Sequence, residues 1–457
     1  MGSLAMLIVT ARRQIIYFLE RDHATKYDVN FVHQLEFPAI TICNVNRHRR
    51  SAMTIKDIAI MGAQLGFTDD HHNLLHPELY PEDWYNETFL MTDWEAVHNS
   101  ITEDDFDLAD FYARTGHRLE DLVQMCSWKS QKCNTSSWVV EYTHYGKCYT
   151  FNKFADHQLQ KAGSGNGLYL VLYDEEIEYI ETKNTDDLGI KFLPHAQHEP
   201  PFLKELGFGF APGFHYLVTL KQKEITALPL PYGVCEQDHP TQYFQNYTVP
   251  GCRIECETER IYEKCNCRLV ESPGDHPLCT PHQFECAEEM LASIEQSNDC
   301  LCQNPCHAVQ YPYAMSLLEI RETTIDKLRK DHPIPPELNT DNIIVLNIYF
   351  DSLSFETVTQ VPAYTFNSII SDLGGAMGLW LGASILAAAQ MLDYCGRMCH
   401  ARFISKASCC NPTEVDDIKP TAVQAEKRED IVSVWATPRN LSQSASDLKE
   451  EDISDVD

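Results

Sequence analysis

The segment that decides the fold is Leu373-Gly-Gly-Ala-Met-Gly-Leu-Trp-Leu-Gly-Ala-Ser-Ile-Leu-Ala-Ala-Ala-Gln-Met-Leu392. It contains twenty residues and no formal charge. A helix rises about 1.5 Å per residue, so a helix of this length spans a hydrocarbon core of about 30 Å. The segment therefore predicts a transmembrane helix, and Asp372 and Asp393 stand at its two ends.

The composition of this segment is unusual for a simple lipid anchor. Its small and polar residues are Gly374, Gly375, Gly378, Gly382, Ser384 and Gln390. Small residues let helix backbones approach one another, and polar residues face a partner or water. The pattern favours a helix that packs closely against other helices. A single-pass anchor that is merely rich in glycine is the alternative.

Composition and charge narrow the class of protein. A chain of 457 residues is long enough for two or three domains, or for one large domain. Its net charge of -31 argues against nucleic acid as a partner, because binding phosphates requires clustered Lys and Arg. The sequence contains no nucleophile elbow, phosphate-binding loop or HExxH motif, so we expect no enzymatic activity and no cofactor.

Cysteine usage indicates an oxidising compartment. Fourteen of the eighteen cysteines lie between Cys43 and Cys306, a dense and even set that predicts disulfides. Zinc is the competing interpretation for Cys265-x-Cys267, but zinc pairs usually have two to four spacer residues, so we expect no metal site. An extracellular surface also suits the glycosylation sequons at Asn86, Asn134 and Asn246.

Hydrophobic periodicity divides the rest of the chain. Residues 4–9 are apolar and Arg12 and Arg13 follow soon after, so residues 1–20 resemble the second half of a transmembrane helix. Strands are predicted at 35–43, 138–151, 167–174, 214–220 and 342–350, with the middle three in one sheet. Helices are predicted at 285–297 and 316–330. The polar C-terminal tail is expected to be disordered.

A series of motifs then connects the chain to a known family. The motifs are Phe37-Pro-Ala-Ile-Thr-Ile-Cys-Asn44, Cys148-Tyr-Thr-Phe-Asn152, Gly207-Phe-Gly-Phe-Ala-Pro-Gly-Phe214, Cys252-Arg-Ile-Glu-Cys256, Cys265-Asn-Cys-Arg268, Pro273-Gly-Asp275, Cys279-Thr-Pro281 and Asp372-Leu-Gly-Gly-Ala-Met-Gly-Leu-Trp-Leu-Gly-Ala-Ser384. In this order they resemble the degenerin/epithelial sodium channel superfamily, and within it the acid-sensing ion channels. The resemblance covers residues 15–395.

The resemblance implies an α+β membrane protein of the plasma membrane, with several membrane passes. Two transmembrane helices, the first truncated here, would carry a large disulfide-rich extracellular domain. That domain would combine a β-sheet palm and β-ball with helical finger, thumb and knuckle parts. Its expected divisions are a first-helix remnant at 1–20, the extracellular domain at 21–363 (thumb 235–330), the pore helix at 364–395 and a cytosolic tail at 396–457.

The resemblance also implies seven disulfides. Cysteine counting alone leaves their connectivity open. The family pattern pairs Cys43–Cys148, Cys126–Cys133, Cys235–Cys306, Cys252–Cys302, Cys256–Cys300, Cys265–Cys286 and Cys267–Cys279.

The family's pore residues map onto the glycine-rich segment. Gly382, Ala383 and Ser384 resemble the selectivity element, where backbone carbonyls or hydroxyls replace part of a cation's hydration shell. Asp372 and Asp393 would form charged rings at the two pore mouths, and Gly375 and Gly378 would line the pore. The implied assembly is a homotrimer or a trimer with related subunits, held in membrane lipid. Sodium would permeate, calcium would bind at the outer pore, and amiloride-type compounds would block.

The resemblance implies gating by extracellular protons. Carboxylates forced together share protons, and histidine titrates between pH 5 and 8. His23 and Asp28 match family positions tied to proton gating. The paired-acid candidates are Asp186 with Asp187, Glu288 with Glu289, and the run Glu103-Asp104-Asp105.

Some positions depart from the family pattern. Tyr232 replaces a tryptophan that couples the thumb to the membrane helix, and Ala292 replaces an acid of the subfamily's acidic pocket. Three alternatives therefore stay open. They are a member of this family gated by a peptide or a bile acid, a constitutively open member, and a non-conducting receptor ectodomain or truncated subunit.

Gln390 generates the first prediction, because it replaces the family's Glu six residues after the selectivity serine, and Thr365 replaces another acid. The loss of one charged ring predicts weaker discrimination between sodium and potassium, and weaker external calcium block. Reversal potentials under bi-ionic conditions, compared between wild type and Gln390→Glu, test this. Glu at position 390 is expected to shift the reversal potential toward sodium selectivity, and identical values would show that Gln390 does not set it.

Overall fold

The computed structural model describes residues 2–100, 106–154, 157–182, 187–236, 240–297, 299–331, 336–382 and 385–407. The chain divides into two units, residues 1–383 and 384–457, and each is described by itself. The predicted paired acids at Glu103-Asp104-Asp105 lie outside the described residues, as do Asp186, Ala383, Ser384 and most of the C-terminal tail.

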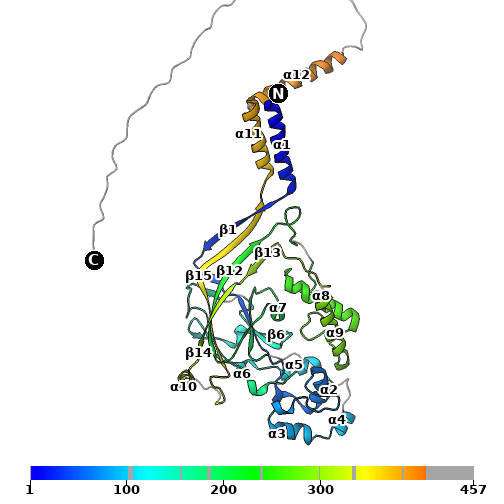
Figure 1. The fold of residues 1–457 in the computed structure, drawn as a ribbon, viewed down its shortest axis with the longest axis vertical. Coiled ribbons are helices and arrows are strands. Elements are labelled where there is room, and N and C mark those ends of the chain that lie inside the picture. The colour runs from blue at the N-terminus through cyan, green and yellow to red at the C-terminus, as the bar shows by residue number, and fades with distance from the viewer. Residues whose placement is uncertain are drawn as a thin grey trace, which may run out of the picture. The chain divides into compact units, whose positions relative to one another are not determined.

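An eight-stranded sheet forms the framework of the first unit (Figure 1). Its longest strand, β15 (Ile343–Pro362), pairs in parallel with β12 (Phe214–Thr226) and antiparallel with β9 (Leu168–Tyr173) and β1 (His23–Phe31). The other members are β4 (Val123–Trp128), β5 (Gln131–Lys132), β13 (His307–Gln310) and β14 (Tyr313–Glu319). Residues 343–348 of β15 are buried without interruption, as expected of a central strand covered on both faces.

A second, five-stranded sheet packs against the first. Its order is β11 (Phe208–Phe210), β10 (Ile190–His195), β3 (Ala39–Asn44), β7 (Gly146–Phe151) and β6 (Trp138–Thr143). A short pair, β2 (Leu35–Glu36) and β8 (Gln158–Leu159), lies apart. One apolar core joins both sheets, and Phe37, Phe151, Phe192 and Phe350 are fully buried in it. The prediction of a single sheet is therefore wrong, because period-two patterning indicates a strand but not its partner.

Helices cover the far end of the sheets. They are α2 (Ile55–Leu65), α3 (Glu82–Tyr85), α4 (Trp94–Ser100), α5 (Leu108–Thr115) and α6 (Leu119–Leu122), with a π-helix at Asn86–Leu90 and 3-10 helices at Arg50–Ala52, Pro77–Leu79, Thr135–Ser137 and Glu176–Glu178. Thr54 and Asp57 form a capping box at the start of α2. Ile58, Met61 and Phe111 are buried in a second apolar core beneath these helices.

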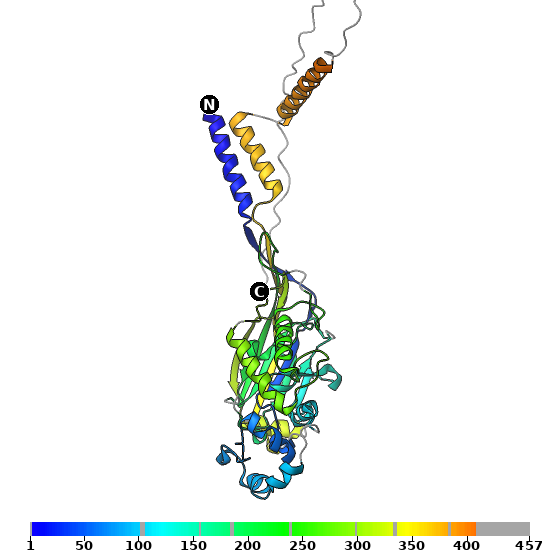
Figure 2. The same ribbon diagram turned by 90° about the vertical axis from the view of Figure 1, so that its right-hand side faces the viewer.

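A disulfide-bonded helix pair flanks the sheets (Figure 2). It consists of α8 (Val249–Cys265) and α9 (Pro281–Ser297), and the short α7 (Leu203–Leu206) lies in the loop before β11. The structure contains the disulfides Cys43–Cys148, Cys126–Cys133, Cys235–Cys306, Cys252–Cys302, Cys256–Cys300, Cys265–Cys286 and Cys267–Cys279. These are the seven pairs that the family resemblance implies.

The helix predicted over 316–330 is partly wrong. Its first residues belong to β14, whose Ser316 pairs with Leu217 of β12, and the helix α10 (Glu322–Asp331) begins only afterwards. Pairing with a neighbouring strand overrides the helical pattern in the sequence.

Two helices continue directly from the framework strands. The helix α1 (Gly2–Glu20) precedes β1, and α11 (Phe366–Leu381) follows β15, so the two helices lie side by side (Figures 1 and 2). Within the described part of the chain, α1 is the one helix long and apolar enough to cross a membrane. In α1, Arg12 and Arg13 do not end the helix, which continues to Glu20.

The continuous helix expected over 373–392 is absent from the structure. It is replaced by α11 and by α12 (Ile385–Ala407), which belongs to the second unit and includes residues 396–407 of the predicted tail. Gly382 ends α11 with a left-handed backbone (φ +62°), and its N–H donates to the carbonyl of Gly378. Glycine adopts this conformation without the steric penalty that a side chain would add.

The packing of α2 on α5 generates a prediction about stability. The buried carboxylate of Asp57 accepts two hydrogen bonds of 3.0 Å from Arg114 and caps α2, whereas the exposed Asp110 lies 3.5 Å from the same guanidinium. Asp57→Ala leaves the Arg114 guanidinium without its buried partner and removes the acidic residue of the capping box. We expect it to lower the free energy of unfolding by about 2–4 kcal/mol.

Thermal unfolding of the purified full chain provides the measurement, and Asp110→Ala is the matched control. We expect a clearly lower melting temperature for Asp57→Ala and an almost unchanged one for Asp110→Ala. Equal shifts in both variants would contradict this interpretation of the ion pair.

Candidate functional site

Asp372, predicted at the outer pore mouth, lies inside α11 rather than at its end. Thr365 caps α11, so the helix begins six residues before Asp372. A role of Asp372 at the outer pore mouth stays a prediction. The Tyr364 hydroxyl donates to the Asp372 carboxylate at 2.5 Å. The Tyr364 ring also contacts Tyr17 of α1, with centroids 5.3 Å apart. An aromatic pair and a hydrogen bond thus hold the exposed Asp372 side chain next to α1.

A cavity of about 740 Å³ opens between the two helices at this level. Asp372 and Tyr364 line it from one side, and Arg13 and Tyr17 line it from α1. It mixes charged and aromatic groups, and lipid chains solvate such a mixture poorly.

Gly374 and Gly375 of α11 are not required for packing within one chain. Gly375 and Gly378 are exposed, and a Cβ added at Gly375 would meet no atom within 4 Å. Small residues on a membrane helix permit close approach of another helix. The open surface at Gly375 is therefore available to a neighbour that is not part of this chain.

The predicted selectivity element coincides with the break between α11 and α12. Gly382 has the left-handed backbone described above, while Ala383 and Ser384 lie outside the described residues. Non-helical backbone at membrane depth is tolerated where it lines protein or water.

In α12, Gln390 is exposed and Asp393 forms an ion pair of 2.9 Å with Arg397. Asp393 thus lies within a helix that continues to Ala407, beyond the predicted end of the pore helix at residue 395. Its role at the inner pore mouth stays a prediction.

His23 and Tyr232 meet at the base of α1. The His23 ring nitrogen Nδ1 lies 3.0 Å from the Tyr232 carbonyl, which can only accept, so Nδ1 carries the proton. Arg21 donates to the Tyr232 hydroxyl at 2.9 Å, and its guanidinium lies 5.5 Å from the centre of the ring. The aromatic position predicted to couple the extracellular part to the membrane helix therefore contacts the residues just after α1.

Among the residues that the structure describes, the other predicted proton sensors are not brought together. Asp28 pairs with Lys26 at 2.7 Å, and its odd separation from His23 along β1 places the two on opposite faces of the strand. Glu288 faces Arg47 at 4.0 Å, while Glu289 is exposed. Adjacent positions on a helix do not face each other, so these two do not form a carboxylate pair. Asp187 is exposed.

Asp174 is a buried carboxylate that the sequence reasoning missed. It follows β9 and is fully buried, and burial raises its pKa to about 7 even though the Tyr179 hydroxyl donates to Oδ1 at 2.9 Å. Its other oxygen, Oδ2, is buried without a hydrogen-bond partner among the described residues. An acid directly after a fully apolar strand was the available signal for such a site.

Two more carboxylates have similar surroundings. Burial raises the pKa of Glu199, which follows β10, to about 7, and a hydrogen bond from the backbone at Ala196 only partly opposes this. Burial raises the pKa of Glu271 to about 7 as well, against the opposing field of Arg47. Beside Asp174, His117 and Glu175 form a buried contact of 2.6 Å that joins the loop after α5 to the loop after β9. Desolvation thus raises the pKa of three carboxylates of the first unit, Asp174, Glu199 and Glu271, to about 7.

The three sequons occupy different surfaces. Asn134 and Asn246 are exposed, and Asn86 is half-buried at the start of the π-helix. Their glycosylation stays a prediction.

Comparison with known proteins identifies the family. The sequence profile of the amiloride-sensitive sodium channel family matches residues 1–394. Acid-sensing ion channel 1C of Danio rerio is 36% identical over 86% of this chain and 76% of its own length. Acid-sensing ion channel 2 of Homo sapiens is 37% identical over 86% of this chain and 79% of its own length. Acid-sensing ion channel 1 of Gallus gallus is 35% identical over 90% of this chain and 80% of its own length.

The chain belongs to the amiloride-sensitive sodium channel family, which confirms the resemblance seen in its motifs. It is therefore a sodium channel subunit of the plasma membrane and not an enzyme. A solved proton-activated chloride channel aligns with a TM-score of 0.31 and 8% identity, over 85% of this chain and 93% of that one. That likeness carries no inference.

The buried Asp174 generates a prediction about pH and stability. Its pKa in the folded protein is above the ordinary value, so the folded state holds this proton more tightly than the unfolded chain does. The resulting stability is present at low pH and is lost as the pH rises through about 7. Asp174→Asn, which cannot ionise, should raise the melting temperature at pH 8 and change it little at pH 5.

The exposed Asp187→Asn is the control and should have no effect at either pH. A stability gain of Asp174→Asn that is equal at pH 5 and pH 8 would show that ionisation of Asp174 is not its cause.

Proposed function

We propose that this chain forms the pore of a trimeric, sodium-selective channel that extracellular protons open and amiloride-type compounds block. The observation that carries the proposal is a set of three carboxylates, the buried Asp174 and the half-buried Glu199 and Glu271, and the loss of solvent raises the pKa of each to about 7. All three belong to the first unit, which contains both α1 and α11. Acidification below pH 7 protonates these three carboxylates and removes their negative charge. The net charge of the unit that contains α1 and α11 then changes.

A path from these groups to the helices supports the proposal. Asp174 directly follows β9, which pairs with β15, and β15 leads into α11. The loop around Tyr232 contacts Arg21 and His23 below α1, and the backbone N–H of Leu228 donates to the Gln360 side chain near the end of β15 at 3.0 Å. The loop therefore contacts both strands that continue into the helices. A rearrangement of the extracellular part would act on both helices together.

The trimer is supported by the unused surface of α11. Glycines that are not needed for contacts within the chain fit an axis where three helices crowd together. Three copies of Asp372 around that axis would attract cations, with sodium as the permeant ion and calcium bound at the outer mouth. Gly382, Ala383 and Ser384 would supply the narrow constriction.

The proposed topology is multi-pass, with the disulfide-bonded part outside the plasma membrane. Seven disulfides require an oxidising compartment, and the sequons at Asn134 and Asn246 lie on exposed surface. In this arrangement α1 and the α11–α12 segment are the two membrane passes.

Voltage clamp of cells expressing the chain, during steps from pH 7.4 to 5, tests the function. We expect an inward sodium current that amiloride blocks. Asp174→Asn should move the half-maximal pH, because one of the titrating groups is then permanently neutral, while the exposed Glu322→Gln should leave it unchanged.

The other family behaviours give different results. A constitutively open channel would pass amiloride-sensitive current that does not respond to pH. A channel gated by a peptide or bile acid would stay closed until that ligand is added. If the protein reaches the cell surface and no amiloride-sensitive current appears under any of these conditions, the channel proposal is wrong.

A further inference from the structure

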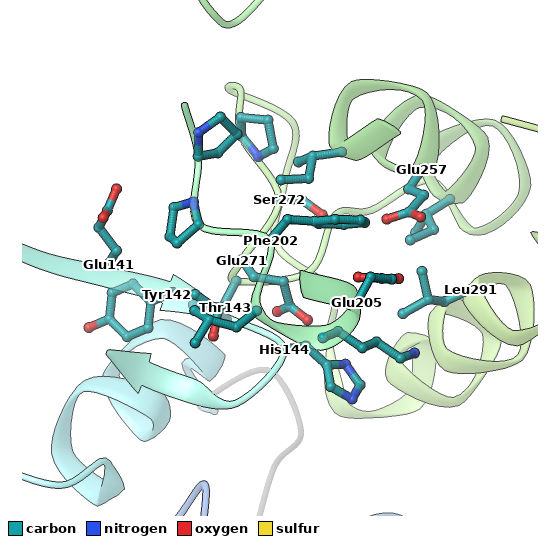
Figure 3. A pocket seen from close by; sticks show the side chains of 18 of the residues that line it. Glu141, Tyr142, Thr143, His144, Phe202, Glu205, Glu257, Glu271, Ser272 and Leu291 are labelled. Carbon is teal, nitrogen blue, oxygen red and sulfur yellow. The ribbon is translucent and has the colours of Figure 1, made fainter. Parts of the chain in front are cut away.

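Two cavities of the first unit differ in the charge of their linings. The first has a volume of about 280 Å³ and is lined by carboxylates that include Glu205, Glu257 and Glu271 (Figure 3). The second has a volume of about 660 Å³ and lies where β12 ends, β13 begins and the chain approaches α8. We call the second one the β13 cavity.

The walls of the β13 cavity come from three parts of the chain. Thr226 at the end of β12 and His307 at the start of β13 are paired across the sheet. Next to them is Cys306, which is disulfide-bonded to Cys235. Residues 241 and 245–247, just before α8, close the other side. A cavity of this size is large enough for a small organic ligand.

The lining of the β13 cavity is polar but carries little charge. Among the described residues, no lysine or arginine lines it, and Glu236 is its one carboxylate. An anionic ligand would therefore find no permanent cation to pair with. Hydroxyl, amide and imidazole groups come from Thr226, Gln245 and His307. Such a lining suits an uncharged ligand that has many hydrogen-bonding groups.

Three of these polar side chains have hydrogen-bonding capacity to spare. Those of Glu236, Gln245 and His307 make no hydrogen bond or ion pair within the part of the chain that the structure describes. The backbone of Glu236 is nevertheless fixed, because its N–H donates to Asn304 at 2.9 Å and its carbonyl accepts from Cys306 at 3.0 Å. The half-buried Glu236 carboxylate is therefore held at the cavity and stays available to a ligand.

Ring surfaces complete the lining. Pro229 and Pro305 contribute their rings, and the Tyr247 hydroxyl donates to the Gln303 carbonyl at 2.7 Å, which fixes the aromatic ring beside them. A pyranose sugar has a face of C–H groups and a rim of hydroxyls. Aromatic and proline rings pack on the C–H face, and polar side chains bind the rim, so this lining fits a sugar.

The wall of the β13 cavity also contains an attachment point for a sugar. Asn246 lines the cavity, is exposed and begins the sequon Asn246-Tyr247-Thr248. The Thr248 hydroxyl caps α8 by accepting from the Gly251 N–H at 3.1 Å, so the sequon is tied to the start of a helix. A sugar joined to Asn246 begins at the cavity and is held there at a high effective concentration.

We propose that Asn246 carries an N-linked glycan whose first N-acetylglucosamine residue occupies the β13 cavity. In its attachment, Nδ2 of Asn246 loses a proton and bonds to C1 of the sugar. The bond from C1 to a lipid diphosphate donor breaks, and the diphosphate keeps its electron pair. In the folded protein, the acetamido and hydroxyl groups of the sugar hydrogen-bond to Glu236, Gln245 and His307, and its ring packs against Tyr247.

The occupied cavity would also restrain the base of α1. The Pro229 carbonyl accepts from the Tyr232 N–H at 3.1 Å, and Tyr232 contacts Arg21 and His23. A sugar packed against Pro229 therefore limits the motion of the loop around Tyr232. The attachment and seating of the glycan do not depend on the proposed channel function.

Enzymatic deglycosylation of the full chain, expressed in animal cells and purified in detergent, tests the proposal. Peptide N-glycosidase F cleaves the bond between asparagine and the first sugar and leaves aspartate, so the mass of each sequon peptide reports the cleaved fraction. In the folded wild-type protein, we expect release at Asn246 to be about tenfold slower than after denaturation, because the enzyme must wait for the sugar to leave the cavity.

Two matched variants assign the protection to this cavity. Ala227→Phe fills the β13 cavity without altering a sequon, and it should make release at Asn246 in the folded protein about tenfold faster than in wild type. Ala314→Phe adds the same side chain to the exposed strand β14 and should leave release at Asn246 slow. Release at the exposed Asn134 should be the same in both variants. Melting temperatures close to wild type establish that the variants are folded.

An unmodified Asn246 peptide would overturn the proposal. Release at Asn246 that is as fast in the folded wild-type protein as after denaturation would also overturn it, as would slow release that Ala227→Phe leaves unchanged. Failure of the channel proposal would appear as missing current and would leave these release rates unaffected.

Discussion

The pairing of β1 with β15 is the constraint on which the rest of the structure depends. Nine residue pairs join the two strands, from His23–Pro362 to Phe31–Ser354, and the Ala363 N–H extends the ladder by donating to the Asp22 carbonyl at 2.9 Å. Each strand continues within a few residues into its helix. The relative position of α1 and α11 is therefore set by a ladder of backbone hydrogen bonds outside the helices themselves.

The same strand β15 reaches the centre of the apolar core that joins the two sheets. Its first half is buried between β9 and β12, and its second half pairs with the exposed strand β1. A buried charge that appears or disappears beside β9 therefore acts on a strand, β15, that leads into α11 and pairs with the strand that follows α1. Asp174 directly follows β9 and occupies such a position. This geometry gives a physical reason why protonation far from the helices would move them.

Much of this architecture could be predicted from residue patterns, and the exceptions are informative. The apolar run at 342–350 predicted the buried half of β15, but its polar continuation to Pro362 is a strand only because β1 and β12 pair with it. The glycine-rich segment predicted a special membrane element, yet the helix break at Gly382 depends on a backbone conformation that hydropathy does not encode. Sequence patterns also do not predict which acids lose solvent in the fold, such as the half-buried Glu271. Their burial is produced by segments far apart in the sequence.

The central claim is that the loop around Tyr232 transmits changes in the extracellular part to the base of α1. A double-mutant cycle of Arg21→Gln and Tyr232→Phe tests it most directly, with the half-maximal activation pH as readout. The Arg21 guanidinium donates to the Tyr232 hydroxyl, so each variant removes the same contact. The account predicts that each single variant shifts this pH and that the double variant shifts it no further than the larger single effect. Fully additive shifts, or no shift in either single variant, would contradict it.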